Sequence, residues 1–247
     1  MSVNARCGTA AVLLAVLLAA GTADVATGEQ AAAAGAGGAG PSGQPVSFTT
    51  SDGITLAGTL FGSGPAGVVL AHMFPTDQTS WHPFARQLAA EGFRALAFDF
   101  RGYGQSGGPR RIDLIDRDVR AASAYLRGQG VQRVALVGAS MGGTAAIKVA
   151  AGDGAGALVV ISSPQAFRGL VVSSAELARL RMPSLWISSG GDSVTPAMRA
   201  MYAAAGGART LHIYPGSAHG TYLFDSPYGA DLAGRILVFI ARAVPPR

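Results

Sequence analysis

The chain has 247 residues, 49% of them hydrophobic, and a formal net charge of +5. This length and apolar content are enough to bury a full hydrophobic core in one domain. The positive charge comes almost entirely from scattered arginines, since Lys148 is the only lysine and only Arg110 and Arg111 are adjacent, which excludes the clustered basic stripe that nucleic-acid binding needs.

Residues 1–23 have the pattern of a secretory signal peptide. Arg6 supplies a positive charge, residues 10–20 are uninterruptedly apolar, and residues 21–23 are small enough for cleavage. The apolar run is too short to span a bilayer comfortably, so we expect a secreted or extracytoplasmic protein without stable membrane insertion. An uncleaved signal anchor that tethers the protein to a membrane is the alternative.

The only cysteine, Cys7, lies within this segment. Cleavage would leave a mature chain without a thiol, which excludes disulfide bonds and a cysteine nucleophile together. Residues 24–43 are predicted to be a disordered linker, because their alanine- and glycine-rich part from 31 onward has no large apolar side chain to bury. The folded domain is predicted over residues 44–247.

Strand-like and helix-like segments alternate along this domain. The first two strands flank Asp52-Gly53, a strong hairpin signal, and should pair antiparallel at a sheet edge. Several later strands are continuously apolar, as expected for parallel strands covered on both faces. The predicted strands are residues 46–50, 54–61, 67–72, 93–99, 134–137, 157–161, 184–188 and 209–214. The predicted helices begin near residues 80, 113, 144, 173, 195 and 226.

This alternation predicts an α/β fold with a mostly parallel eight-stranded sheet and helices on both faces. Ligands of such sheets bind beyond the carboxyl ends of the strands. Residues 162–183, between two of the strands, leave room for one short helix with a capping box at Ser173 and Glu176, and for no lid domain.

The sequence around Ser140 has the pattern of a nucleophile on a sharp turn. An apolar strand ends in Gly138-Ala139-Ser140-Met141-Gly142, and a helix-favouring stretch follows at once. A serine on such a turn projects its hydroxyl clear of the sheet only if the residues two before and two after lack side chains. A second Gly-x-Ser-x-Gly string, around Ser106, is followed by Gly-Pro and cannot open a helix directly. Ser140 is therefore the predicted nucleophile.

No cofactor and no metal ion are predicted. Two Gly-x-Gly-x-x-Gly strings occur, over residues 62–67 and 102–107. A dinucleotide site needs this string after a strand and at the start of a helix. The first string leads into a strand and the second opens no helix. The sequence also has no His-x-x-x-His pair or cysteine cluster that would hold a metal ion.

A serine hydroxyl needs a base to remove its proton and a third group to orient that base. His219, in the loop after the last strand, can reach a nucleophile at the same edge of the sheet. Asp192 lies just past the carboxyl end of another strand and is the candidate acid.

The chain order Ser140, Asp192, His219 resembles that of the α/β-hydrolases. The resemblance extends from residue 44 to the end and includes residues 70–75 and 99–106. It implies an α/β-hydrolase fold with a minimal lid or none, and an oxyanion hole formed by the N–H of Met141 and one from the loop after the third strand. Pro75 has no N–H, so Phe74 is the expected second donor and Met73 the fallback.

The sequence departs from this family at one position. Many relatives have His-Gly where this chain has His72-Met73, which bears on the turn that presents the second donor. His72 itself is expected to be structural.

The function predicted from these residues is that of a secreted serine hydrolase that cleaves small-molecule carboxylic esters through an acyl-enzyme intermediate. A peptidase or a lactone hydrolase on the same triad is the first alternative, although the dienelactone hydrolases normally use cysteine at this turn. A non-catalytic binding protein on the same fold is the second. The sequence leaves the physiological substrate, the acyl-chain preference and the oligomeric state open.

Overall fold

The structure is a computed structural model that describes residues 42–246. The predicted signal peptide lies outside the described residues, as does the predicted linker apart from Ser42 and Gly43. None of the helices within the described range combines the length and the apolar character needed to traverse a bilayer.

An eight-stranded sheet forms the centre of the fold, in the strand order β1-β2-β4-β3-β5-β6-β9-β10. The first two pairings, β1 with β2 and β2 with β4, are antiparallel, and the other five are parallel. The strands are β1 (Gln44–Thr49), β2 (Thr55–Phe61), β3 (Ala66–Ala71), β4 (Phe93–Phe98), β5 (Arg133–Ala139), β6 (Ala157–Ile161), β9 (Ser184–Ser189) and β10 (Arg209–Tyr214). The predicted eight-stranded, mostly parallel sheet is confirmed.

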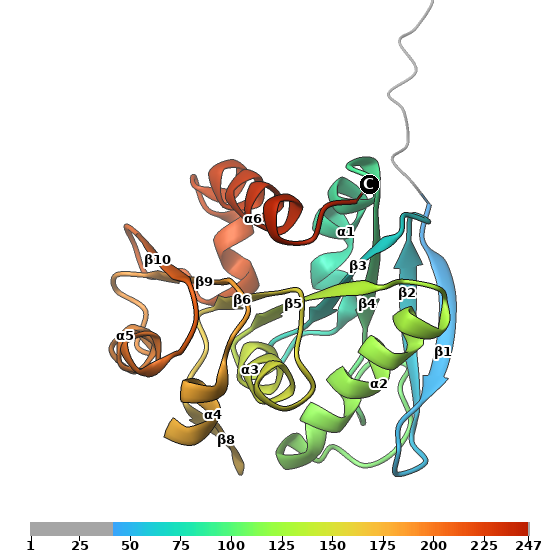
Figure 1. The fold of residues 1–247 in the computed structure, drawn as a ribbon. Coiled ribbons are helices and arrows are strands. Elements are labelled where there is room, and N and C mark those ends of the chain that lie inside the picture. Colours follow the sequence, from blue (N-terminus) through green and yellow to red (C-terminus); the bar gives the residue numbers. More distant parts are fainter. Residues whose placement is uncertain (1–41, 247) are drawn as a thin grey trace, which may run out of the picture. The chain divides into compact units, whose positions relative to one another are not determined.

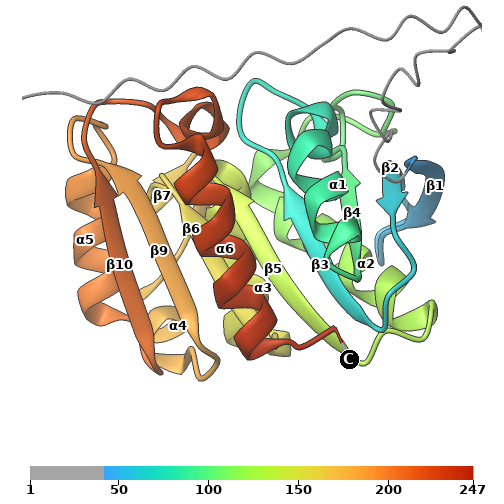
Figure 2. The same ribbon diagram turned by 90° about the horizontal axis from the view of Figure 1, so that it is seen from above.

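Helices cover both faces of this sheet. Figures 1 and 2 show α1 and α6 on one face and α2, α3, α4 and α5 on the other. The α-helices are α1 (His82–Ala90), α2 (Ile115–Gly128), α3 (Met141–Asp153), α4 (Ser174–Arg179), α5 (Thr195–Ala204) and α6 (Gly229–Ala243). Three 3₁₀ helices are η1 (Gln78–Trp81), η2 (Ile112–Leu114) and η3 (Gly220–Asp225).

The side chains of β3 show how one apolar run serves two cores. Val69 and Ala71 belong to the cluster that packs against α2 and α3. Val68 and Leu70 point to the opposite face and pack with residues of α1 and α6. Because successive side chains of a strand alternate between faces, a strand that lies between two helical layers is apolar at every position.

The structure differs from the sequence prediction in the segment between β6 and β9. Besides the predicted short helix α4, with its capping box at Ser173 and Glu176, this segment forms a two-stranded hairpin of β7 (Ala166–Phe167) and β8 (Leu170–Val171). Two-residue strands are too short for a periodic pattern, so they could not be predicted from the sequence.

Two predicted helix starts are also corrected. The Thr195 hydroxyl does not cap α5, because it donates to the Ser189 carbonyl oxygen and pairs with the Ser188 hydroxyl, and the cap position is Val194. Ser226 caps a turn rather than α6: its hydroxyl donates to the Leu223 carbonyl oxygen, and the helix begins only at Gly229.

The strand order reverses beside β3. The chain passes from β3 to β4 on one side and then returns to β5 on the other. The loops that follow β3 and β5 therefore diverge at a switch point, which is where open α/β sheets bind their ligands.

Candidate active site

Ser140 lies on a strained turn between β5 and α3. Its backbone dihedrals are φ 51° and ψ −122°, in a region that residues with a Cβ seldom adopt. The Ser140 N–H donates to the Ile161 carbonyl oxygen at 2.8 Å, which fixes the turn to the end of β6. Positive φ at a non-glycine residue is retained only where the surroundings enforce it, and such residues cluster at functional sites.

The glycines on either side of Ser140 allow the start of α3 to approach the sheet closely. A Cβ at Gly138 would lie 2.5 Å from the Gly143 nitrogen, and one at Gly142 would lie 2.5 Å from the His72 carbonyl oxygen. Real Cβ atoms do not come this close to backbone, so both positions require glycine. Besides exposing the serine, the two glycines let α3 pack against β5 and the end of β3.

The other string, around Ser106, has a structural role. The Ser106 hydroxyl donates to the Asp99 carbonyl oxygen at 2.6 Å and accepts from the Ala57 N–H at 2.9 Å. The first bond closes the loop after β4 on itself, the second joins that loop to β2, and no helix follows Ser106 directly. The prediction that Ser106 is not on the nucleophile turn is confirmed.

The structure brings Asp192 and His219 together. The His219 Nδ1 lies 2.8 Å from the Asp192 Oδ2. The Asp192 side chain is 3% exposed and that of His219 is 32% exposed. Burial alone would raise the pKa of Asp192, but hydrogen bonds from His219, the Ser162 hydroxyl and the Val194 N–H hold that pKa below its ordinary value. An ionised Asp192 keeps the proton of a neutral imidazole on Nδ1 and leaves Nε2 free as a base.

Backbone contacts hold the aspartate and histidine loops in register. The Gly191 N–H donates to the Gly216 carbonyl oxygen at 2.8 Å, and the Ser189 hydroxyl donates to the Ala218 carbonyl oxygen at 2.7 Å. The first bond continues the pairing of β9 and β10 beyond the strand ends, and the second ties the last residue of β9 to the histidine loop. The short distance between Asp192 and His219 therefore follows from the register of the two strands.

Ser140 and His219 lie at the same edge of the sheet without a direct bond. A Cβ at Gly220 would lie 3.6 Å from the Ala139 Cβ, so the residue after the histidine packs beside the residue before the serine. No hydrogen bond between the Ser140 hydroxyl and the His219 ring is present within residues 42–246. In enzymes without substrate such bonds are often long and tighten only when the substrate is bound.

The N–H of Met141 is the first in α3 and has no intrahelical acceptor, as expected at a helix N-terminus. The loop after β3 presents a second N–H in a fixed direction. The Met73 carbonyl oxygen accepts from the His72 Nδ1 at 2.9 Å and from the Thr76 hydroxyl at 3.0 Å. In a trans peptide the next N–H points the opposite way, so these bonds also orient the N–H of Phe74.

His72 is a structural residue, as its burial and bonds indicate. The Phe100 N–H donates to the His72 Nε2 at 3.1 Å, which places the imidazole proton on Nδ1. Burial lowers the pKa of His72 and keeps the ring neutral.

Met73 fills a space beside the histidine loop. Its side chain is fully buried in the apolar cluster on the α1 and α6 face. A Cβ at Gly220 would lie 2.5 Å from the Met73 sulfur. The bulk that this chain carries at position 73 is thus matched by the missing side chain at position 220.

Two neighbours of the predicted site, Ser162 and Tyr103, were not predicted from the sequence. Ser162, at φ 46°, is buried directly after β6, and its hydroxyl helps to lower the pKa of Asp192. Tyr103, 4% exposed, has its hydroxyl 4.0 Å from the Met141 sulfur. The one feature that could have indicated Ser162 is its place directly after a predicted strand. Tyr103 reaches the site only through the fold of its loop.

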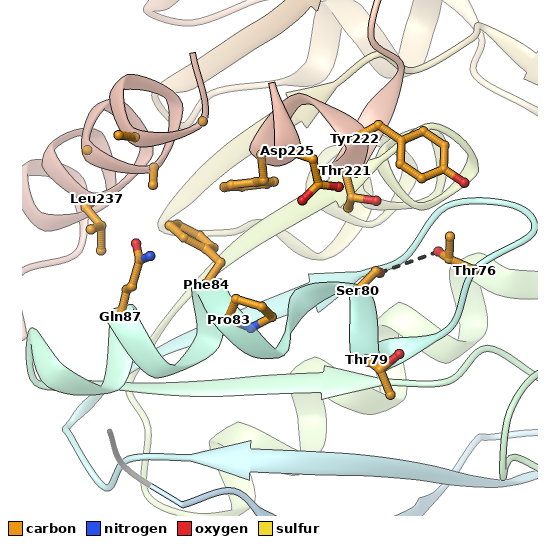
Figure 3. Close-up of a pocket in the computed structure, with 15 residues that line it drawn as sticks. Thr76, Thr79, Ser80, Pro83, Phe84, Gln87, Thr221, Tyr222, Asp225 and Leu237 are labelled. Carbon is orange, nitrogen blue, oxygen red and sulfur yellow. Dashed lines mark hydrogen bonds between the residues drawn. The ribbon is translucent and has the colours of Figure 1, made fainter. Parts of the chain in front are cut away.

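A cavity of about 730 Å³ opens between the two helices on one face of the sheet. Figure 3 shows Phe84 and Gln87 of α1 opposite Leu237 of α6, with Thr76 and Thr221 toward one end. Thr76 and Thr221 follow the candidate donor loop and the histidine loop in sequence, so this end of the cavity adjoins both. Ser140 and His219 are not among its lining residues. Over residues 42–246, no group of three or more His, Cys, Asp or Glu side chains is placed to hold a metal ion.

Comparison with known proteins identifies the family. Residues 68–183 match the sequence profile of the Alpha/beta hydrolase family. An uncharacterized protein of Mycobacterium tuberculosis is 30% identical over 206 residues, which cover 72% of this chain and 73% of the relative. The bifunctional epoxide hydrolase 2 of Sus scrofa is 37% identical over 93 residues, covering 37% of this chain and 17% of that protein.

The fold is similar to that of solved hydrolases. An esterase of Pyrococcus furiosus superposes with a TM-score of 0.73 at 20% identity, over 83% of this chain and 92% of the esterase. Identity this low shows the fold alone. The shared fold, the profile match and the relative that is similar over most of its length lead to one conclusion: this chain belongs to the α/β-hydrolase family.

Proposed function

We propose that the protein is an exported serine hydrolase that cleaves small-molecule carboxylic esters. The observation that carries the proposal is that two parts of a catalytic triad lie at one edge of the sheet. The first part is Ser140 on its strained turn, and the second is the pair of His219 and Asp192, joined by a 2.8 Å hydrogen bond. Esterases among the structural neighbours support this reading, and export rests on the pattern of residues 1–23.

In the proposed mechanism, the His219 Nε2 takes the hydroxyl proton as Ser140 attacks the acyl carbon, and Asp192 accepts from Nδ1 throughout. The N–H groups of Met141 and Phe74 stabilise the oxyanion of the tetrahedral intermediate. That intermediate breaks its bond to the alcohol oxygen, which receives the proton from His219. Water then attacks the acyl-enzyme with His219 as base and releases the acid.

The local similarity to epoxide hydrolases suggests a second reaction, but the chemistry of Ser140 argues against it. A serine oxygen that opens an epoxide forms an ether, which has no acyl carbon for water to attack. The enzyme would be consumed after one turnover. Amides and lactones do form an acyl-enzyme, so they belong in the substrate panel beside esters.

The test is labelling and turnover of the wild type and of two serine variants. A fluorophosphonate probe is expected to label the wild type at Ser140, and Ser140→Ala should lower kcat/KM for short p-nitrophenyl esters at least about 10³-fold. The matched control is Ser106→Ala, which removes the serine of the other Gly-x-Ser-x-Gly string and should still be labelled. Full turnover by Ser140→Ala would refute the mechanism, and an unlabelled wild type would favour a binding protein.

A further inference from the structure

The β7–β8 hairpin reaches the loop that carries the second oxyanion donor of the proposed mechanism. The rings of Phe167 and Phe74 have their centroids 5.9 Å apart. The guanidinium of Arg168, at the tip of the hairpin, lies 4.5 Å from the centroid of the Phe74 ring and 5.5 Å from that of Phe167. An exposed cation thus stacks on the residue whose N–H faces the reacting carbonyl in the proposed mechanism.

A second arginine, Arg110, stacks on an aromatic ring of the same site. The guanidinium of Arg110 lies 4.2 Å from the centroid of the Tyr103 ring, and the Tyr103 hydroxyl lies 4.0 Å from the sulfur of Met141, the residue after Ser140. Burial raises the pKa of Tyr103, and the charges of Arg110 and Arg168 oppose this rise. Both cations therefore lie within electrostatic reach of one phenol beside the nucleophile.

Neither charge is neutralised by a neighbouring acid among the described residues. Arg168 forms no ion pair there, and Arg110 reaches only the Gly102 carbonyl oxygen, at 3.4 Å. Asp113 lies beside the hairpin, since a Cβ at Gly169 would be 3.2 Å from the Asp113 Cβ. Both of its carboxylate oxygens are bonded by Arg111, at 2.9 and 2.6 Å. The site is thus left with a positive charge at two points.

Stacking leaves the hydrogen-bonding edge of an arginine available. A guanidinium that lies over an aromatic ring uses its face, while its N–H groups point outward in the plane. Those N–H groups match the two oxygens of a carboxylate, or those of a phosphate. Two such edges beside the nucleophile would hold the charged end of a substrate while its ester reaches Ser140.

We propose that this hydrolase prefers esters that carry a second, anionic group, held by Arg110 and Arg168. The inference rests on the proposed ester hydrolysis and names its substrate class. The charge can lie on the acyl part or on the alcohol part of the ester, and the experiment separates these two cases.

The test compares esters matched in length. Monomethyl adipate and methyl hexanoate differ only in a carboxylate on the acyl part, and 4-(hexanoyloxy)butanoate and butyl hexanoate differ in a carboxylate on the alcohol part. Alcohol and acid release give kcat/KM for each. The wild type should favour the charged member of at least one pair by about tenfold, the scale of one charge-assisted hydrogen bond. Addition of about 0.5 M sodium chloride should reduce this ratio, because salt screens exposed charges.

Arginine variants locate the preference. Arg168→Gln and Arg110→Gln should each lower the ratio of charged to neutral ester by about threefold to fivefold, and the double variant should bring it close to one. Arg168→Lys keeps the charge but loses the paired N–H edge, so it should retain only part of the ratio. The control is Arg199→Gln, on the exposed side of α5, which should leave both rates unchanged.

The outcomes separate this inference from the proposed function. Hydrolysis of the neutral esters with no preference for charge, or a preference that survives in the double variant, overturns the role of the two arginines alone. Failure to hydrolyse any ester, with no labelling of Ser140, overturns the proposed function and the substrate class with it.

Discussion

His72 is fully buried between the loops that follow β3 and β4, and both of its ring nitrogens are bonded to backbone. Through the Met73 carbonyl oxygen it sets the direction of the Phe74 N–H. A side chain far from any proton transfer can therefore affect catalysis by positioning a donor.

Replacement of His72 by Phe is expected to lower kcat for ester hydrolysis about 10- to 100-fold with little change in KM, because the donor acts on the transition state. The pH–rate profile should keep its shape, since His72 is not the base. His72→Gln can accept from the Phe100 N–H and donate to the Met73 carbonyl oxygen, and should restore part of the activity. Steady-state kinetics measure kcat and KM of both variants, and His82→Gln in α1 is the control. A change in KM alone would contradict the positioning role of His72.

At the scale of elements, the turn between β5 and α3 depends on backbone contact. Gly138→Ala should lower the free energy of unfolding by about 2–4 kcal/mol, because the new Cβ meets the backbone of α3 rather than a side chain that could move. The matched control is Gly128→Ala at the end of α2, where no atom lies within 4 Å of the added Cβ. That variant should be as stable as the wild type or up to about 1 kcal/mol more stable. Urea unfolding measures both, and equal effects would contradict the close-packing argument.

The elements that the sequence predicted correctly are those with a strong local pattern. The strands β3, β5 and β6 are apolar at nearly every position because both of their faces are covered. Ser140 could be predicted because glycines are required on both sides of it, where the backbone of α3 packs closely against the sheet. The hairpin of β7 and β8 and the stacking of Arg168 on Phe74 could not, since they depend on where distant loops meet.

At the scale of the whole molecule, one buried cation joins three distant segments. Arg101, after β4, bonds Asp52 in the β1–β2 turn at 2.8 and 3.0 Å, and Asp118 in α2 at 2.8 and 2.6 Å. Burial disfavours the charge of Arg101, but the two carboxylates outweigh this and raise its pKa. The same ion pair lowers the pKa of Asp52 well below its ordinary 3.8.

Arg101→Gln should lower the free energy of unfolding at pH 7 by about 3–5 kcal/mol, because Asp118 is left buried without a counter-ion. Burial raises the pKa of Asp118, so the variant regains stability relative to the wild type as the pH falls toward 4 and this carboxyl is protonated. The wild type also loses the contribution of Asp52 in the same direction, below its ordinary value of 3.8. Unfolding at several pH values measures the difference, which should shrink with acidity.

The control for that experiment is Arg117→Gln. Arg117 pairs with the same Asp52 carboxylate at 3.0 Å, but its side chain is 44% exposed. Exposed pairs contribute at most about 1 kcal/mol, so this variant should stay close to the wild type. Two results would contradict the role of the buried ion pairs. One is a large loss of unfolding free energy in Arg117→Gln, and the other is a loss in Arg101→Gln that does not depend on pH.

The contact between Met73 and Gly220 bears on how this enzyme can be redesigned. Any side chain introduced at position 220 collides with the methionine sulfur, whereas a glycine introduced at position 73 opens a void beside the histidine loop. Single-site libraries at either position would thus mostly yield inactive clones. Because Gly220 also has φ 58°, a smaller residue at position 73 relieves only the collision. Libraries that vary both codons should therefore recover active clones mainly with asparagine or aspartate at position 220, which tolerate this backbone region.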